Sequence, residues 1–369
     1  MTDFGQMGFT EAQIDMLNVA EGFCRDKSPI ETVRALMTEP LGYNPDTWAE
    51  IGALGWLAIA IPEAYDGVGL SLTEVVPVAE QMGRRMMHTP FVSTTLAAQA
   101  VITGGTEAQK AEYLPKIAAG TAATLALSET NGDWDLANID STASRNSDGG
   151  FTLSGTKVFV MDLHAAEFVI ISAMLDGAPA LFLIEAASIA QDNRRRETLI
   201  DETKRGFEVT LDGIRMPETA LMDTAKTEET LARIHLAANL LNAAELTGAC
   251  QSCIEYTVEY LGTRKQFGKL IGSFQALKHP TVDAFVDYQK SRSLLYAAAY
   301  SFERQGEGEI ATRMAKTKAE TSLSFAADRS IQFHGGFGFT YDCDAQLYRR
   351  RAIFLASQHG AARCHKQKL

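Results

Sequence analysis

The sequence LARIHLAANLLNAAELTGACQSCIEYTVEYL, residues 231–261, places apolar side chains at helical spacing on two faces. One stripe recurs in steps of three and four residues and consists of Leu236, Leu240, Ala243, Thr247, Cys250, Ile254, Val258 and Leu261. A second stripe consists of Leu231, Ile234, Ala238 and Leu241. A helix with two apolar faces is buried on two sides, as in a helical bundle or at a subunit interface. This stretch therefore predicts a bundle helix, and helix-like sequence continues after it.

The segment before this helix, residues 121–222, is rich in short β-type runs separated by turns. Some of these runs alternate apolar and polar residues, and others are rich in β-branched and aromatic residues. The runs are 151–154, 168–171, 181–184 and 207–211. We therefore expect a mainly antiparallel β-domain.

The N-terminal segment, residues 1–120, has the composition of helices. Ala, Leu, Met and Glu dominate it, while Pro40, Pro62 and Gly67 separate its parts. A chain of 369 residues is long enough for two or three domains. The predicted class is α+β multidomain. Its expected parts are an N-terminal α-helical domain (1–120), a middle antiparallel β-domain (121–222) and a C-terminal four-helix bundle that carries an oligomer interface (223–369).

Composition and charge exclude several classes of protein. A net charge of −12 argues against non-specific binding to nucleic acid. No apolar run approaches the roughly 20 residues that span a bilayer, and the N-terminus lacks the basic and apolar regions of a secretion signal. The five cysteines are an odd number and are scattered, which is typical of reduced thiols in the cytosol. The sequence predicts a cytoplasmic protein without a membrane segment, a nucleic-acid site or a metal site.

Four separated motifs carry more specific information. The two most distinctive are YLGTRKQFGK at 260–269 and QFHGGFGFT at 332–340. LGWLAIAIPEAYDGVGL at 54–70 and LSET at 127–130 precede them. In content and order these motifs resemble those of the acyl-CoA dehydrogenase family, and the resemblance covers nearly the whole chain.

The resemblance implies a fold, a cofactor and a reaction. Family members have the domain order expected above and bind FAD. A carboxylate base removes the pro-R α-proton of an acyl-CoA thioester, and a hydride leaves the β-carbon for flavin N5. The product is a trans-2-enoyl-CoA, and a separate electron-acceptor flavoprotein takes the electrons. The implied ligands are therefore FAD, an acyl-CoA substrate and an electron acceptor.

The same resemblance identifies candidate cofactor residues whose chemistry suits FAD. The planar donors of Arg264 match the charged pyrophosphate, Gln266 can donate a further bond, and Phe267 offers an apolar ring. A glycine pair lets main-chain amides approach a ligand without a Cβ clash. The predicted set is completed by Gln332, Gly335, Gly336 and Ser128. In the family, most of these groups reach the flavin of a neighbouring subunit.

The family's base is missing from both of its usual places. One place lies in a Glu-Gly pair about 27 positions after the signature glutamine, and here it holds His359 followed by Gly360. The other lies about 26 positions before the signature arginine, and here it holds Ala238. The sequence therefore predicts no catalytic residue at the usual positions.

Two flavin contacts of the family are also altered. A threonine near the flavin edge is replaced by Met161, although Phe159 keeps an aromatic ring nearby. A threonine after the base position is replaced by Ala361. Thus the groups given to a neighbour's cofactor survive, and those that a subunit uses for its own flavin and substrate are lost.

This pattern favours the subunit without the base in an α2β2 complex, where a homologous subunit holds the carboxylate. Bacterial family members of the steroid side-chain type have this architecture. Three alternatives stay open. His359 is itself the base of an active homotetramer, or Glu245, on the same helix face as Ala238, is a relocated base. In the third, the chain is a non-enzymatic structural subunit without flavin.

Overall fold

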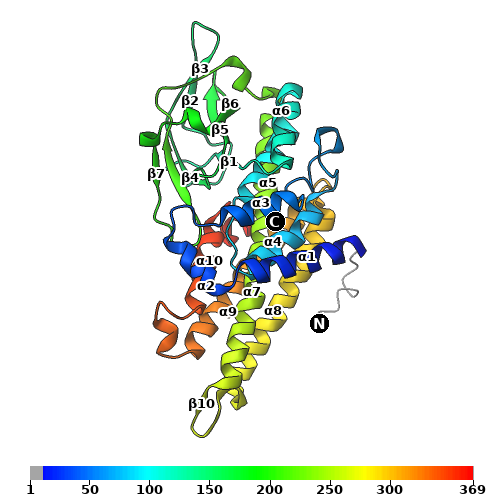
Figure 1. Cartoon of the computed structure of the whole chain (residues 1–369), viewed down its shortest axis with the longest axis vertical. Coiled ribbons are helices and arrows are strands. Elements are labelled where there is room, and N and C mark those ends of the chain that lie inside the picture. The colour runs from blue at the N-terminus through cyan, green and yellow to red at the C-terminus, as the bar shows by residue number, and fades with distance from the viewer. Residues whose placement is uncertain (1–10, 369) are drawn as a thin grey trace. The chain divides into compact units, whose positions relative to one another are not determined.

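The chain runs from helices through strands to helices, and the computed structural model describes residues 11–368 (Figure 1). The helices before the first strand are α1 (Glu11–Lys27), α2 (Ile30–Thr38), α3 (Pro45–Ala53), α4 (Leu72–Arg84), α5 (Phe91–Gly104) and α6 (Glu107–Ala118). The strands that follow are β1 (Ala123–Ala126), β2 (Thr142–Arg145), β3 (Phe151–Ser154), β4 (Thr156–Met161), β5 (Phe168–Leu175), β6 (Ala178–Glu185), β7 (Arg194–Arg196), β8 (Gly206–Thr210) and β9 (Ile214–Met216). The C-terminal elements are α7 (Thr227–Thr263), β10 (Lys265–Gln266), β11 (Lys269–Leu270), α8 (Gln275–Ser301), α9 (Glu307–Phe333), α10 (Ala345–Ser357) and α11 (Ala362–Gln367). This order confirms the predicted fold class.

The chain forms two compact units, each built from separate stretches of sequence. Of residues 11–368, the helical unit comprises those up to Val33, then Thr73–Met87, and those from Asn239 onward. The β-containing unit comprises Arg34–Leu72 and His88–Ala238.

Long helices form the core of the helical unit. α8 packs along α9, and α10 packs on α9. Hydrogen bonds join α7 to both neighbours. Thr247 on α7 lies 3.0 Å from Ser291 on α8, and Thr257 donates to Ser330 on α9 over 2.8 Å. The two-sided apolar pattern of residues 231–261 is explained by this burial, because α7 contacts different helices on different faces.

A close crossing of α4 and α7 shows why small residues occur in the helical unit. A Cβ atom added at Gly248 would lie 1.8 Å from the carbonyl oxygen of Glu80. A Cβ atom added at Gly83 would lie 2.2 Å from the carbonyl oxygen of Glu245. Both distances are far below van der Waals contact, so the two main chains meet where neither helix has a side chain.

Two sheets organise the β-containing unit. The larger has the order β1-β5-β2-β3-β9, with β6 added beside β5, and the smaller has the order β4-β8-β7. β5 pairs in parallel with β1 and β2, and the other pairings within these sheets are antiparallel. Because β5 is central, seven of its eight residues are buried, which explains its nearly continuous apolar sequence.

The β-containing unit has one apolar core between its strands. Phe151 and Phe182 lie at its centre with ring centroids 5.3 Å apart in an edge-to-face arrangement. The middle domain is therefore mainly antiparallel, as predicted.

Among residues 11–368, no helix combines the length and apolar character needed to cross a membrane.

Candidate cofactor site

The first predicted cofactor motif forms a short hairpin directly after α7. The amide of Arg264 donates to the carbonyl of Tyr260 over 2.9 Å, and β10 then pairs with β11. Phe267 and Gly268 form the two-residue turn with φ values of 51° and 74°. Two successive positive φ values are typical of a type I′ hairpin turn, for which glycine is well suited. The hairpin holds its predicted cofactor residues at the surface, and Phe267 is 91% exposed.

The second predicted motif forms the turn after α9. Gln332 lies in the last turn of the helix, and Gly335 has a left-handed φ of 61°. A Cβ atom added at Gly335 or Gly336 would meet nothing within 4 Å, so open space lies in front of this turn. By contrast, a Cβ atom at Gly338 would lie 2.1 Å from the carbonyl of Ile331. Gly338 is therefore needed for packing, and the exposed glycine pair is available to a ligand.

Ring stacking brings these two motifs to one end of the helical unit. The ring centroids of Tyr260 and His334 are 4.1 Å apart with planes inclined by 24°. Tyr260 lies one turn before Arg264, and His334 immediately precedes Gly335. The structure thus brings together two motifs that are about 70 positions apart in the sequence.

The residues at this end fit the pyrophosphate of FAD. Arg264 is exposed, and its guanidinium has no hydrogen bond or ion pair to any residue from 11 to 368. A free guanidinium suits a doubly charged phosphate group. The amide of Gly335 already donates to the carbonyl of Gln332 over 3.1 Å, so the glycine turn offers open space for a ligand and not a free Gly335 donor. Both the donor set and the space in front of Gly335 and Gly336 are therefore compatible with the predicted cofactor.

The seventh predicted residue, Ser128, lies in the β-containing unit just after β1. Its side chain is buried, and Oγ has no hydrogen-bond partner within the part of the chain that the structure describes. Its carbonyl accepts a bond from the amide of Val158 over 3.0 Å, which fixes it beside β4. Phe159 on β4 has a φ of 52° at a β-bulge, and its ring lies 6.2 Å from that of Trp134. A buried hydroxyl without a partner is consistent with a ligand contact.

A buried ion pair beside Ser128 was not recognised from the sequence. Nζ of Lys157 lies 2.5 Å from Oε1 of Glu129 and donates to Ser172 over 3.0 Å. Burial opposes the ionised form of Glu129, but the Lys157 ammonium and the amide of Ser141 hold its pKa below the ordinary value. No local pattern reveals the pair, because lysine and glutamate are normally exposed and 28 positions separate these two residues.

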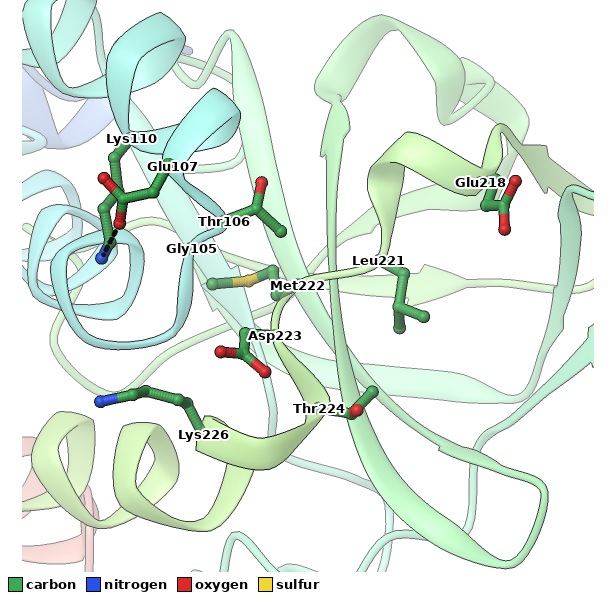
Figure 2. Close-up of a pocket in the computed structure, with 10 residues that line it drawn as sticks. All are labelled: Gly105, Thr106, Glu107, Lys110, Glu218, Leu221, Met222, Asp223, Thr224 and Lys226. Carbon is green, nitrogen blue, oxygen red and sulfur yellow. Dashed lines mark hydrogen bonds and ion pairs between the residues drawn. The ribbon is translucent and has the colours of Figure 1, made fainter.

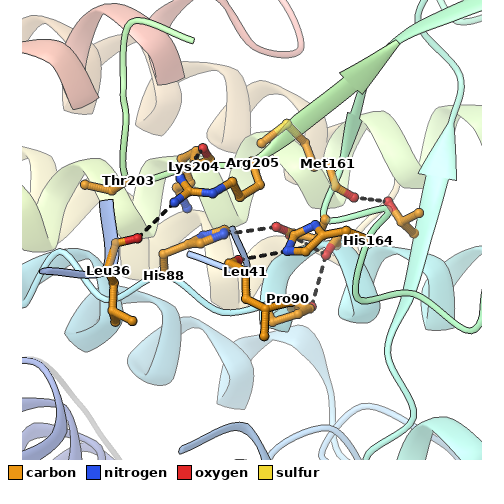
Figure 3. Close-up of polar contacts among 12 residues, drawn as sticks. Leu36, Leu41, His88, Pro90, Met161, His164, Thr203, Lys204 and Arg205 are labelled. Atoms are coloured by element: carbon orange, nitrogen blue, oxygen red, sulfur yellow. Dashed lines mark hydrogen bonds and ion pairs between the residues drawn. The ribbon is translucent and has the colours of Figure 1, made fainter. Parts of the chain in front are cut away.

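A second buried polar cluster lies at the end of β4 (Figure 3). Oδ1 of Asp162 lies 3.1 Å from Nε2 of His88, and Oδ2 accepts a 2.7 Å hydrogen bond from Ser93. Burial opposes ionisation of Asp162, but His88 and Ser93 hold the pKa of this carboxyl below its ordinary value. Asp162 has a left-handed φ of 58°, so the cluster fixes a strained main chain directly after Met161.

Arg205, also in Figure 3, ties the end of α2 to the loop before β8. Its buried guanidinium donates to a ring of main-chain carbonyls, at distances of 2.8–3.4 Å, from Leu36, Met37, Glu39, Pro40, Glu202 and Lys204. Burial lowers the pKa of Arg205 to about 10, so the group stays charged at neutral pH. Several of these carbonyls are helix-end acceptors that need donors, which explains why an arginine is buried here.

The two positions where the family places its base belong to different units of this chain. Ala238 is fully buried in the β-containing unit. In the helical unit, His359 and Gly360 have left-handed φ values of 56° and 98°, and Asn239 donates from Nδ2 to the His359 carbonyl over 3.2 Å. Glu245 is buried on α7, where its main chain meets Gly83.

The β-containing unit also has a groove of about 510 Å³ (Figure 2). It is lined by residues at the start of α6 and by the segment 218–226. Within it, Lys110 is paired with Glu107 over 2.9 Å. None of the seven predicted cofactor residues lines the groove, so it is not the candidate site.

Comparisons with known proteins agree with this description. The family profile described as "Acyl-CoA dehydrogenase, C-terminal domain" matches residues 233–366, and that of the "Acyl-CoA dehydrogenase, N-terminal domain" matches residues 10–121. The acyl-CoA dehydrogenase IpdE2 of Mycolicibacterium smegmatis is 30% identical over 336 residues, which cover 90% of this chain and 87% of that protein.

Two solved structures are similar over nearly the whole chain. A steroid ACAD, named for the pair Tcur3481-Tcur3483 and solved in a variant form, matches with a TM-score of 0.85 and 28% identity, covering 97% of this chain and 96% of that one. Butyryl-CoA dehydrogenase from Megasphaera elsdenii matches with a TM-score of 0.88 and 22% identity, covering 98% and 97%. The second likeness shows the fold alone.

Proposed function

This chain belongs to the acyl-CoA dehydrogenase family, and from that premise we propose that it is the subunit without a base in a heteromeric enzyme. Family membership makes the protein an FAD-dependent oxidoreductase that dehydrogenates an acyl-CoA thioester between its α- and β-carbons. In the proposed complex, a homologous subunit holds the carboxylate, and this chain supplies residues that bind that subunit's FAD.

The observation that carries the proposal is that this chain lacks the family's catalytic base but keeps the residues expected to bind the FAD pyrophosphate. Neither Ala238 nor His359 offers a carboxylate at the positions where the family places its base. The pyrophosphate-type donors are nevertheless present and exposed, with Arg264 unpaired within residues 11–368. A chain that had lost the whole function would have no reason to keep an exposed arginine beside an open glycine turn.

Each retained group has a role that follows from its chemistry. Arg264 would bind the pyrophosphate through a charge-assisted fork, and the absence of side chains at Gly335 and Gly336 would let the cofactor approach the turn closely. Gln266 and Gln332 would add neutral hydrogen bonds, and Phe267 would cover an apolar ring face. Ser128 would donate its buried hydroxyl to the flavin of its own subunit if one were held there. When bound, FAD supplies the hydride acceptor for the β-carbon.

The relatives support a complex of two different chains. The steroid ACAD that is 28% identical to this chain is named for two components, Tcur3481 and Tcur3483. We therefore propose an α2β2 assembly with a homologous acyl-CoA dehydrogenase chain, acting on a steroid-derived or other acyl-CoA, with an electron-acceptor flavoprotein as the electron sink. A cytoplasmic location is supported by five cysteines that form no disulfide, four of them buried.

The test is to purify the chain alone and together with homologous acyl-CoA dehydrogenase chains of its own organism. Native mass spectrometry would give the assembly, and flavin absorbance would give FAD per complex. We expect little FAD and no flavin reduction by acyl-CoA for the chain alone, and a flavin-loaded α2β2 complex with its partner. A homotetramer with one FAD per chain that turns over at roughly 1–1,000 s⁻¹ would contradict the proposal. That result would favour a base at His359 or Glu245.

A further inference from the structure

We propose that His334 is a positioning residue of the cofactor site. Its imidazole stacks on two tyrosines of α7 and thereby holds the turn with Gly335 and Gly336 beside the hairpin that carries Arg264. This inference rests on the proposed function, because it concerns the same FAD contacts. It adds a residue that contacts no phosphate itself but sets the distance between the groups that do.

The three rings form a compact stack. The centroid of His334 lies 4.1 Å from that of Tyr260 and 4.7 Å from that of Tyr256, with planes inclined by 24° and 11°. Nearly parallel rings at these separations are in stacking contact. Because the two tyrosines are one helical turn apart, the imidazole is held at two successive levels of α7. We call Tyr256, Tyr260 and His334 the ring stack.

Hydrogen bonds fix the orientation of the imidazole within this stack. Nδ1 of His334 lies 2.7 Å from the carbonyl of Ser330, so Nδ1 carries the proton and donates. Oγ of Ser330 in turn accepts from Thr257 on α7 over 2.8 Å. The hydroxyl of Tyr256 lies 3.6 Å from the sulfur of Cys343. The last turn of α9 is therefore joined to α7 by the ring stack and by a separate hydrogen bond.

Burial distinguishes His334 from the rest of its motif. Gln332, Gly335 and Gly336 are exposed, whereas His334 is 3% exposed. Burial lowers the pKa of His334, so the ring is neutral at physiological pH. Its Nε2 has no hydrogen-bond partner within residues 11–368. A buried imidazole with one nitrogen unsatisfied is a costly way to fill space, which indicates that this position requires a flat ring.

The position of the ring stack explains its consequence for the cofactor. The carbonyl of Tyr260 accepts a hydrogen bond from the amide of Arg264, so movement of this tyrosine moves the arginine. His334 precedes Gly335, so movement of the imidazole moves the glycine turn. A diphosphate must contact both sides at once, and a contact displaced by about 1 Å loses much of a charge-assisted hydrogen bond.

The experiment compares three substitutions at His334 in the assembled complex. His334→Phe keeps a ring, His334→Leu fills the space without one, and His334→Ala removes both ring and volume. The measured quantities are the Kd for FAD, the rate of flavin reduction at saturating FAD, and assembly by native mass. Phe325→Ala is the control, because it removes a half-buried ring from the same helix outside the ring stack.

We expect His334→Leu and His334→Ala to raise the Kd for FAD about 10-fold, which corresponds to about 1.4 kcal/mol. We expect His334→Phe and Phe325→Ala to stay within about threefold, and flavin reduction at saturating FAD to be unchanged throughout. The inference is overturned if the Leu variant assembles and binds FAD normally, or if Phe325→Ala weakens binding equally. If Arg264→Ala also leaves FAD binding unchanged, the proposed function itself fails. If Arg264→Ala weakens FAD binding but the His334 variants bind FAD like the wild type, only this inference fails.

Discussion

The carbonyl oxygen of His359 accepts a hydrogen bond from Nδ2 of Asn239 over 3.2 Å. His359 has a φ of 56° and Gly360 a φ of 98°, so the main chain is left-handed at both residues. Left-handed conformations are uncommon for residues other than glycine and often mark functional sites. In α10, the helix that leads into this loop, the carbonyl of Leu355 accepts a hydrogen bond from Lys316 over 2.7 Å. The loop that corresponds to the family's base position is thus tied to α7 by Asn239, although it has no carboxylate.

Replacing His359 should leave catalysis by the complex nearly unchanged, because the partner subunit would remove the α-proton. His359→Asn is the better variant, since asparagine tolerates a left-handed main chain, and His359→Ala is the second. A general base contributes about 100- to 10,000-fold to a rate. Single-turnover flavin reduction that falls by about 100-fold in both variants, with FAD still bound, would assign the base to this chain.

Removing the ammonium of Lys157 should destabilise the protein strongly. Lys157→Met leaves the buried carboxylate of Glu129 without its cation, and breaking a buried pair in this way costs about 3–5 kcal/mol. Adding Glu129→Gln should recover part of the loss, because it removes the uncompensated buried charge and its amide oxygen can still accept from one of the two amides, Asp140 or Ser141. The measurement is the urea midpoint of each variant. A loss below about 1 kcal/mol in the single variant would mean that the pair behaves like an exposed one.

The polar cluster that joins Asp162 to His88 and Ser93 should make stability depend on pH. Asp162→Asn preserves the shape and the left-handed main chain but removes the charge that binds His88 and Ser93. We expect a loss of about 1.5–3 kcal/mol at pH 7. The folded pKa of Asp162 is lowered, so its contribution is complete above about pH 4 and is lost as the pH falls through the folded pKa.

The measurement for Asp162 is urea unfolding of wild type and variant at pH 7 and again near pH 3. The difference in free energy of unfolding between wild type and variant should be smaller at the lower pH. Asp66→Asn is the matched control, because Asp66 has a similar φ of 62° but an exposed side chain, and its effect should stay within about 0.5 kcal/mol. If the difference in free energy of unfolding between wild type and Asp162→Asn grew on acidification, the Asp162 carboxyl would not be held ionised in the folded protein.

The crossing of α4 and α7 should not tolerate a methyl group. Gly248→Ala would place Cβ 1.8 Å from the Glu80 carbonyl, and both contacting atoms belong to main chains that cannot rotate away. We expect a loss of at least about 1–3 kcal/mol, measured by urea unfolding. Gly262→Ala on the same helix meets nothing within 4 Å and should be neutral or up to about 1 kcal/mol more stable. Equal effects of the two substitutions would contradict the close crossing.

Local patterns in the sequence were sufficient to predict individual helices and strands, but they did not predict which strands pair. The two apolar stripes of residues 231–261 predicted α7, since helical periodicity depends only on neighbours along the chain. The alternating runs predicted β3 and β8 for the same reason. The parallel pairing of β5 with β1 and β2 could not be predicted, because it depends on which distant strands meet. The domain boundaries at 120 and 222 stay predictions.

The buried charges and the ring stack were also beyond the sequence. Lys157 and Arg205 are of types that are normally exposed, and their partners come from distant segments. His334 looks like a surface residue inside an exposed motif, and only the fold shows that α7 supplies rings to cover it. The seven cofactor residues and the empty base positions came from motif resemblance, and their roles stay predictions.

The most direct test of the central claim is the flavin content of the assembled complex with Arg264→Ala. If this chain gives its arginine to a partner's FAD, the variant should still assemble, and its affinity for FAD should fall by roughly 10- to 150-fold. Arg264→Lys should recover only part of that affinity, because an ammonium cannot reproduce the planar fork. A complex of Arg264→Ala that retains one flavin per site, with the affinity and reduction rate of the wild type, would contradict the account.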